Sequence, residues 1–250
     1  MSGTTQHNGW HEIFEPLQGR RVDIWRVRIS PSAELACLYQ PFLTTDEKYR
    51  AAGYRFDHLQ QSFTISRGVL RILLGRYLDL PPAEIPLRCG SKGKPSLDGF
   101  GLHFNVSHSG RLAVFAFTLG CEIGVDVEQI QAIDNLSEIA NRFFCREEAD
   151  ELLSLPLTER TNAFFLCWTR KEAYIKAIGD GLSAPLDCFR TILRPSEPAR
   201  FVHVNQSPEE ASRWTLHDLV TLPGYAAALA YRDVQRPLRE APVIDSERLL

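Results

Sequence analysis

The chain has no large excess of charge and no long apolar segment. Its formal net charge is only −3 over 250 residues, which argues against a nucleic-acid-binding protein that relies on bulk positive charge. No apolar run approaches the ~18 residues that a membrane-spanning helix needs. Residues 1–10 are polar and lack the apolar centre of a secretion signal. We therefore expect a cytoplasmic protein with no membrane span.

The chain also lacks the cysteine patterns of zinc and disulfide proteins. None of its six cysteines forms a Cys-x-x-Cys pair, and none stands at zinc-ligand spacing from a histidine. We expect buried, reduced thiols of the kind found in cytosolic proteins. The cysteines are Cys37, Cys89, Cys121, Cys145, Cys167 and Cys188.

What is present is the composition of an ordinary globular protein, with 44% hydrophobic and 24% charged residues. Hydrophobic patterning predicts a strand near 22–29, long helices near 57–78 and 159–178, and several strands after each helix. This order predicts an α+β fold with two similar halves. The expected divisions are a loose segment at 1–20, halves at 21–120 and 121–231, and a tail without firm structure at 232–250.

Two segments carry charged residues on faces that a protein core does not normally accept. In the predicted strand at 122–128, Asp126 and Glu128 share one face while apolar residues occupy the other. In the second long helix, Glu172 and Lys176 lie one turn apart on one side. If the segments meet, an all-oxygen ligand set for Mg²⁺ results, which phosphate oxygens would complete. The alternative is a group of solvated carboxylates on an edge strand and a helix surface.

Small polar residues between two predicted strands form a second candidate. The segment Asn105–Gly110 contains two serines and a histidine. We expect a strand at 103–107 and then a turn at 107–110, whose N–H and hydroxyl groups cradle an anion. His108 could donate to a phosphate there. The alternative is a plain polar turn with an exposed histidine.

Basic residues are scattered through the first half of the chain. A phosphate-rich ligand would need several of them, whereas the usual fate of such charges is a solvated helix face. Thr44 and Glu47 carry the spacing of a capping box and predict the start of a helix. Small residues around Gly68 would let another chain or a ligand approach the long helix closely. The basic residues are Lys48, Arg55, Arg67, Arg71, Lys92 and Lys94.

Three blocks of the sequence resemble the signature blocks of one enzyme family. They are Asn105–Ser109, Gly124–Glu128 and Trp168–Lys176, and the turn at Gly93–Pro95 also fits. In order and spacing they are similar to those of the 4′-phosphopantetheinyl transferases of the Sfp type. The similarity spans most of the chain, roughly residues 45–229. The short holo-acyl-carrier-protein synthases of the family trimerise to build their sites. This chain is long enough to hold both halves, so we expect a monomer.

The resemblance implies that coenzyme A binds in a cleft between two pseudo-symmetric halves. Asp126, Glu128 and Glu172 would hold Mg²⁺, or alternatively Mn²⁺, against the diphosphate of coenzyme A. Lys176 would contact the phosphates. Further implied contacts to the phosphate oxygens come from Lys94, Ser107 and His108.

The resemblance is looser where the family binds the 3′-phosphate of coenzyme A. Lys48 and Thr64 fall near family positions that touch this group. A second lysine expected just after Lys48 is absent, because Ala51 stands near that position. Arg50, Arg55 or Arg67 would replace it, and we take Arg67 as the candidate.

The activity implied is transfer of the 4′-phosphopantetheine group to a serine of an apo acyl, peptidyl or polyketide carrier protein, with release of 3′,5′-ADP. Glu172 is the candidate base for the serine proton, directly or through a water, and a water on the metal is the alternative. The carrier would dock near 180–183 and Phe143–Phe144, beside Arg142 and Arg146. The alternatives are a non-catalytic coenzyme A- or nucleotide-binding protein of the same fold, and a Mg²⁺-dependent phosphohydrolase.

Overall fold

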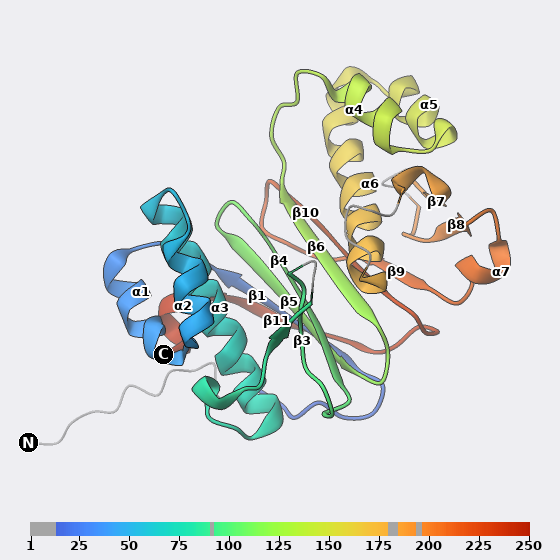
Figure 1. The fold of residues 1–250 in the computed structure, drawn as a ribbon. Coiled ribbons are helices and arrows are strands. Elements are labelled where there is room, and N and C mark those ends of the chain that lie inside the picture. Colours follow the sequence, from blue (N-terminus) through green and yellow to red (C-terminus); the bar gives the residue numbers. More distant parts are fainter. Residues whose placement is uncertain (1–13, 91–92, 180–184, 194–196) are drawn as a thin grey trace, which may run out of the picture.

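The protein folds into two halves, and each contains a main sheet, one helix of 22 residues and several shorter helices (Figure 1). The computed structural model describes residues 14–90, 93–179, 185–193 and 197–250. The predicted α+β fold is confirmed by this mixture of packed helices and largely antiparallel strands. No helix in these ranges is long and apolar enough to cross a membrane.

The first half contains a four-stranded sheet in the order β11-β1-β5-β4. β1 pairs antiparallel with β5 and parallel with β11, and β5 pairs antiparallel with β4. Gly110, with φ +55°, makes the tight turn between β4 and β5. The strands are β1 (Val22–Arg28), β4 (Leu102–Ser109), β5 (Leu112–Leu119) and β11 (Leu238–Asp245).

The last strand differs from the expectation of a tail without firm structure. Residues 238–245 pair with β1 along the free edge of the first sheet, so the end of the chain returns to the first half. Local pattern misses this strand because its partner lies more than 200 residues away and supplies the backbone hydrogen bonds that fix it. A short 3₁₀ helix, η5 (Ser246–Leu249), ends the chain.

The second half contains the sheet β6-β10-β9, in which both pairings are antiparallel. Its strands are β6 (Ile123–Gln129), β9 (Thr215–Asp218) and β10 (Tyr225–Tyr231). A separate pair, β7 (Phe189–Thr191) and β8 (Phe201–Val204), lies beside them. The helices of this half are α4 (Leu136–Phe143), α5 (Arg146–Ser154), α6 (Leu157–Ile178) and α7 (Pro208–Ala211).

Helices of the first half pack around α3 (Asp57–Leu78). The capping box predicted at Thr44 and Glu47 is confirmed at the start of α2, with both reciprocal hydrogen bonds formed. Gly68 of α3 lies against Tyr39 of α1, and a Cβ at that position would overlap the tyrosine ring. The small residue therefore admits a neighbouring helix. The helices are α1 (Ala33–Tyr39) and α2 (Thr45–Ala52). The short elements are η1 (Gln40–Phe42), η2 (Pro82–Glu84), β2 (Arg88–Cys89), β3 (Pro95–Ser96) and η4 (Leu186–Cys188).

The apolar core lies in three layers. One cluster joins α3 to the outer face of the first sheet through residues such as Trp25 and Phe117. A second cluster lies between the two sheets and includes Val114 and Val125. The α6 helix covers the opposite face of the second sheet. Among the cysteines whose side chains the structure describes, the expectation of burial is confirmed for Cys121, Cys145 and Cys167, whereas Cys188 is half-buried and Cys37 is exposed.

Candidate active site

Two carboxylates of β6 face the long helix α6, as the strand pattern predicts. Asp126 is only 2% exposed and Glu128 is half-buried. Gly124 lies on the same face, and a Cβ there would overlap the backbone of Ala173 and Ala177. The glycine therefore lets α6 lie directly on β6. This close approach brings the helix residues on either side of Ala173 to the carboxylates.

Lys176 of α6 forms an ion pair with Asp126 across this contact. The Lys176 Nζ lies 2.6 Å from Asp126 Oδ1 and also donates to Ser107 Oγ at 2.7 Å. Ser107 in turn donates to Asp126 Oδ1 at 2.9 Å. A half-buried lysine, a buried serine and a buried carboxylate from three separate elements thus form one hydrogen-bonded group.

Glu172 is buried beside this group without a matching positive partner of its own. It is 9% exposed, and its Oε1 atom has no hydrogen-bond partner among the described residues. Burial raises the pKa of Glu172 to about 7, with repulsion from Asp126 adding to the shift and Lys176 opposing it. A carboxyl group with such a pKa can exchange a proton near neutral pH.

The donor set fits a hard cation. Asp126 Oδ2 and Glu172 Oε1 are both buried and lack a hydrogen-bond partner in the described structure, and Glu128 contributes a third carboxylate that raises the pKa of Glu172. Oxygen ligands of this kind suit Mg²⁺. The described residues hold no group of three or more His, Cys, Asp or Glu side chains already arranged around a metal position. The assignment of Asp126, Glu128 and Glu172 as metal ligands therefore remains a prediction.

The predicted strand at 103–107 is confirmed, but the turn begins later than predicted, because β4 continues to Ser109 and the turn lies at Gly110 and Arg111. Polar side chains are tolerated in this strand because they hydrogen-bond to β6. The strand puts Ser107 and His108 on opposite faces: Ser107 is buried against Asp126, and His108 is exposed. The two residues therefore contact different parts of the molecule.

His108 lines a basic cavity of about 200 Å³ on its side of β4. Arg50 of α2 and Arg67 of α3 line the same cavity, and both guanidinium groups contact the Phe63 ring, at 5.3 and 5.5 Å from its centroid. Arg67 also lies 3.6 Å from a carboxylate oxygen of Glu47. We call these residues, Arg50, Phe63, Arg67 and His108, the basic cavity.

The sequence leaves open which arginine takes the place of the missing lysine, and the structure adds Arg50 to the cavity beside Arg67. Among the three arginines considered there, Arg67 and Arg50 both line the basic cavity, whereas Arg55 stacks on Phe56 outside its lining. The i, i+4 spacing of Phe63 and Arg67 on a helix predicts their contact. The position of Arg50 depends on how α2 packs on α3, which the sequence pattern does not specify.

Three further predicted residues lie apart from the basic cavity. Lys48 is exposed on α2 and is not part of the lining. The buried Thr64 hydroxyl donates to the Gln60 carbonyl oxygen within α3, at 2.9 Å. Lys94 donates to the Lys176 carbonyl oxygen near the end of α6, and burial lowers its pKa. Lys92 lies outside the described residues.

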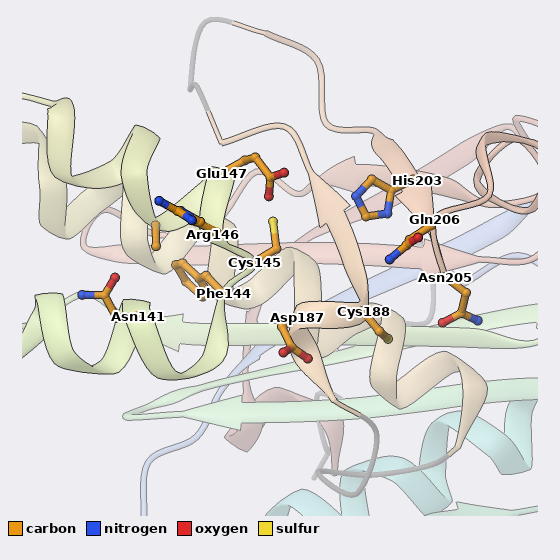
Figure 2. A pocket seen from close by; sticks show the side chains of 11 residues that line it. Asn141, Phe144, Cys145, Arg146, Glu147, Asp187, Cys188, His203, Asn205 and Gln206 are labelled. Carbon is orange, nitrogen blue, oxygen red and sulfur yellow. The ribbon is translucent and has the colours of Figure 1, made fainter.

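A larger cavity, of about 730 Å³, lies between α4–α5 and the β7–β8 pair (Figure 2). Its lining includes Phe144 and Arg146 from the region expected to dock a carrier protein. Phe144 is buried and stacks on Phe164, so its ring is not a surface contact. Arg142 and Arg146 are exposed. The other expected docking segment, 180–183, lies outside the described residues.

Comparisons with known proteins identify the family of the chain. Residues 122–230 match the model of the 4′-phosphopantetheinyl transferase superfamily, and residues 28–119 match that of the 4′-phosphopantetheinyl transferase N-terminal region. The chain is 38% identical to the 4′-phosphopantetheinyl transferase HetI of Nostoc sp., over 86% of this chain and 89% of the relative. It is 29% identical to Sfp of Bacillus subtilis, over 85% of this chain and 92% of that protein. The chain belongs to the 4′-phosphopantetheinyl transferase superfamily.

Proposed function

We propose that the protein transfers the 4′-phosphopantetheine group of coenzyme A to a serine of an apo carrier protein. The observation that carries the proposal is the division of charge across strand β4. Buried carboxylates and Lys176 lie on one side, and the basic cavity lies on the other. Coenzyme A has two matching groups, a diphosphate that binds a cation and a 3′-phosphate that binds cationic side chains. Family membership supports the same activity.

The carboxylate side is the proposed place of the diphosphate. Asp126, Glu128 and Glu172 would hold Mg²⁺, or Mn²⁺ in its place. When bound, this ion neutralises negative charge on the diphosphate oxygens. Lys176 supplies a further positive charge from the protein, and its contact with Ser107 and Asp126 holds it in the site. Such preorganised charges are the main protein contribution to phosphoryl transfer.

The basic cavity is the proposed place of the 3′-phosphate. Two guanidinium groups and an imidazole line it, and guanidinium groups bind phosphate oxygens through paired N–H donors. In this proposal Arg50 and Arg67 bind the 3′-phosphate, in place of the predicted Lys48 and Thr64. His108 keeps its predicted phosphate contact but acts on the 3′-phosphate, separately from Ser107.

Glu172 is the proposed base for the transfer. It accepts the proton of the carrier serine, directly or through a water, as the serine oxygen forms a bond to the β-phosphorus. The bond from that phosphorus to the 3′,5′-ADP oxygen breaks, and Lys176 offsets the charge on the leaving oxygens. Glu172 is the candidate because it is buried beside Asp126 and Lys176 and has an oxygen without a hydrogen-bond partner in the described structure, and a water on the metal is the alternative base.

The test is incubation of the protein with coenzyme A, Mg²⁺ and a panel of apo carriers from fatty-acid, polyketide and nonribosomal-peptide synthesis. We expect the intact mass of at least one carrier to increase by one phosphopantetheine group, and chelation of the metal to abolish the increase. Coenzyme A binding without transfer to any carrier would support the non-catalytic alternative. Release of phosphopantetheine without a carrier would support the hydrolase alternative.

The carrier is proposed to contact the exposed face of α4 and the start of α5. Arg142 and Arg146 present positive charge there, which suits the acidic surface expected around a carrier serine. Reversing both charges should raise the carrier KM and leave the coenzyme A KM unchanged. An unchanged carrier KM would remove this surface from the proposal.

We also propose that the protein is a monomer and that it acts in the cytoplasm. The cysteines whose side chains the structure describes are free thiols, which is consistent with a reducing compartment.

A further inference from the structure

A row of polar side chains on β4 joins the two halves of the protein. Asn105, Ser107 and Ser109 occupy alternate positions and therefore share one face of the strand. Strands β4 and β6 form no backbone ladder in the described sheets, although they pack closely. The three side chains replace that ladder, because each accepts a hydrogen bond from a backbone N–H group of β6.

The three contacts recur at every second residue along both strands. Asn105 Oδ1 accepts from Val125 N at 3.0 Å, and Ser107 Oγ accepts from Val127 N at 3.3 Å. Ser109 Oγ accepts from the next such amide, that of Gln129, at 3.1 Å. Without these acceptors, N–H groups along the edge of β6 would be left to find other partners, at a cost where they are buried.

The two serines of the row also donate to the carboxylates of β6. Ser107 donates to Asp126, and Ser109 donates to Glu128 Oε2 at 2.7 Å. Asn105 has no such counterpart, because Gly124 stands on that face of β6. The row therefore contains two residues that join the halves and hold a carboxylate, and one residue that only joins the halves.

Ser109 fixes the direction of its own hydroxyl proton. Its oxygen receives the Gln129 N–H, which leaves the single hydroxyl proton to donate to Glu128. The contact uses Oε2 and leaves Oε1 for another ligand.

We propose that Ser109 is a positioning residue, which holds the Glu128 carboxylate in the orientation that a divalent cation of the active site needs. The inference rests on the proposed function, since it assumes that Glu128 is a metal ligand. Residues that hold metal ligands in place affect affinity by about 10- to 100-fold when they are removed. Ser107 shares its oxygen with Lys176, so Ser109 is the cleaner residue to test.

The experiment measures Mn²⁺ binding by electron paramagnetic resonance, with coenzyme A present, together with unfolding in urea. Ser109→Ala should weaken Mn²⁺ binding by about 10- to 100-fold, and Ser109→Thr, which keeps the hydroxyl, should restore most of the loss. Asn105→Ala is the matched control. It removes a joining contact without touching a carboxylate, so it should lower the urea midpoint and leave Mn²⁺ affinity at the wild-type value.

Two outcomes overturn the inference. Ser109→Ala with wild-type Mn²⁺ affinity would show that Glu128 needs no such support. Equal losses of affinity in Ser109→Ala and Asn105→Ala would show that the row acts only by joining the halves. If Asn105→Ala does not fold, the comparison of Ser109→Ala with Ser109→Thr decides, and equal losses of Mn²⁺ affinity in these two variants would overturn the inference. A wild-type protein that binds no Mn²⁺ would instead overturn the metal site of the proposed function.

Discussion

The carboxylate side and the basic cavity lie on opposite faces of strand β4 and differ in the sign of the charge that they hold. On the carboxylate side, three acidic groups lie near one ammonium group, and burial and mutual repulsion raise the pKa of Glu172. In the basic cavity, two guanidinium groups contact the Phe63 ring, and Arg67 lies near Glu47. The first region is short of positive charge, whereas the second can accept negative charge.

Other buried charges show what a purely structural charge looks like in this protein. Lys171, beside Glu172 on α6, is fully buried and lies 2.7 Å from Glu148 Oε2. Its Nζ also donates to the carbonyl oxygens of Leu186 and Phe189. Arg170 makes two hydrogen bonds to Asp218. Lys171 and Arg170 are fully paired in this way, whereas Glu172 has a buried oxygen without a hydrogen-bond partner among the described residues, as Asp126 does.

The largest effect is expected from Glu172→Gln. The substitution removes a proposed metal ligand and base, so the rate of transfer to a carrier should fall by about 10³-fold, within the range of general acid–base catalysis. Single-turnover mass spectrometry of the carrier measures it. Glu159→Gln, an exposed position on the same helix, should transfer at the wild-type rate. A fall of less than tenfold in Glu172→Gln would remove Glu172 from the catalytic role.

The ionisation of Glu172 should also affect how the stability of the metal-free protein depends on pH. The pKa of Glu172 is about 7 when folded and 4.5 as its reference value, so the folded state binds more protons between these values. The free energy of unfolding should therefore fall as pH rises from about 4.5 to 7, by up to about 3 kcal/mol from this group.

Urea unfolding in a chelator at several pH values measures this slope. Glu172→Gln should make the slope shallower, although Asp126 and Glu128 contribute in the same direction because burial raises the pKa of both. Glu159→Gln should keep the wild-type slope. Identical slopes in wild type and Glu172→Gln would show that Glu172 titrates alike in the folded and unfolded states.

A change in the basic cavity should affect only the 3′-phosphate. Arg50→Gln should raise the KM for coenzyme A by about 10- to 100-fold, the value of a hydrogen bond between charged groups. The KM for dephospho-coenzyme A, which lacks that phosphate, should stay the same. Arg55→Gln is the control, since Arg55 lies outside the cavity lining. Equal changes with both substrates would mean that Arg50 acts elsewhere.

The smallest effect is expected from Lys48→Ala. Lys48 is exposed and outside the lining of the basic cavity, and exposed charges contribute little. The KM for coenzyme A should change by less than about twofold. A tenfold increase in this KM would show that Lys48 binds the 3′-phosphate, as the family resemblance implies.

The two regions also differ in how far the sequence predicts them. The carboxylate side comes mainly from one strand and one helix, and their periods of 2 and 3.6 residues place Asp126, Glu128, Glu172 and Lys176 on the correct faces. The capping box at Thr44 is equally local, and the structure confirms it.

Contacts between distant segments were beyond the reach of such patterns. The basic cavity draws residues from α2, α3 and β4, so its membership depends on helix packing. The Ser107 hydroxyl turns to Asp126 because β6 lies beside it, and the pairing of β11 with β1 depends on an edge left open by the rest of the sheet. Each is fixed by a partner far away in the sequence.

Calorimetric titration of coenzyme A and dephospho-coenzyme A, each with Mg²⁺ and with a chelator, tests the division of charge most directly. Removing Mg²⁺ should weaken both ligands by about tenfold or more, because the cation links the carboxylates to the diphosphate. Removing the 3′-phosphate should weaken binding by a similar factor whether or not Mg²⁺ is present, because the basic cavity acts independently. Equal affinity with and without Mg²⁺ would contradict the account.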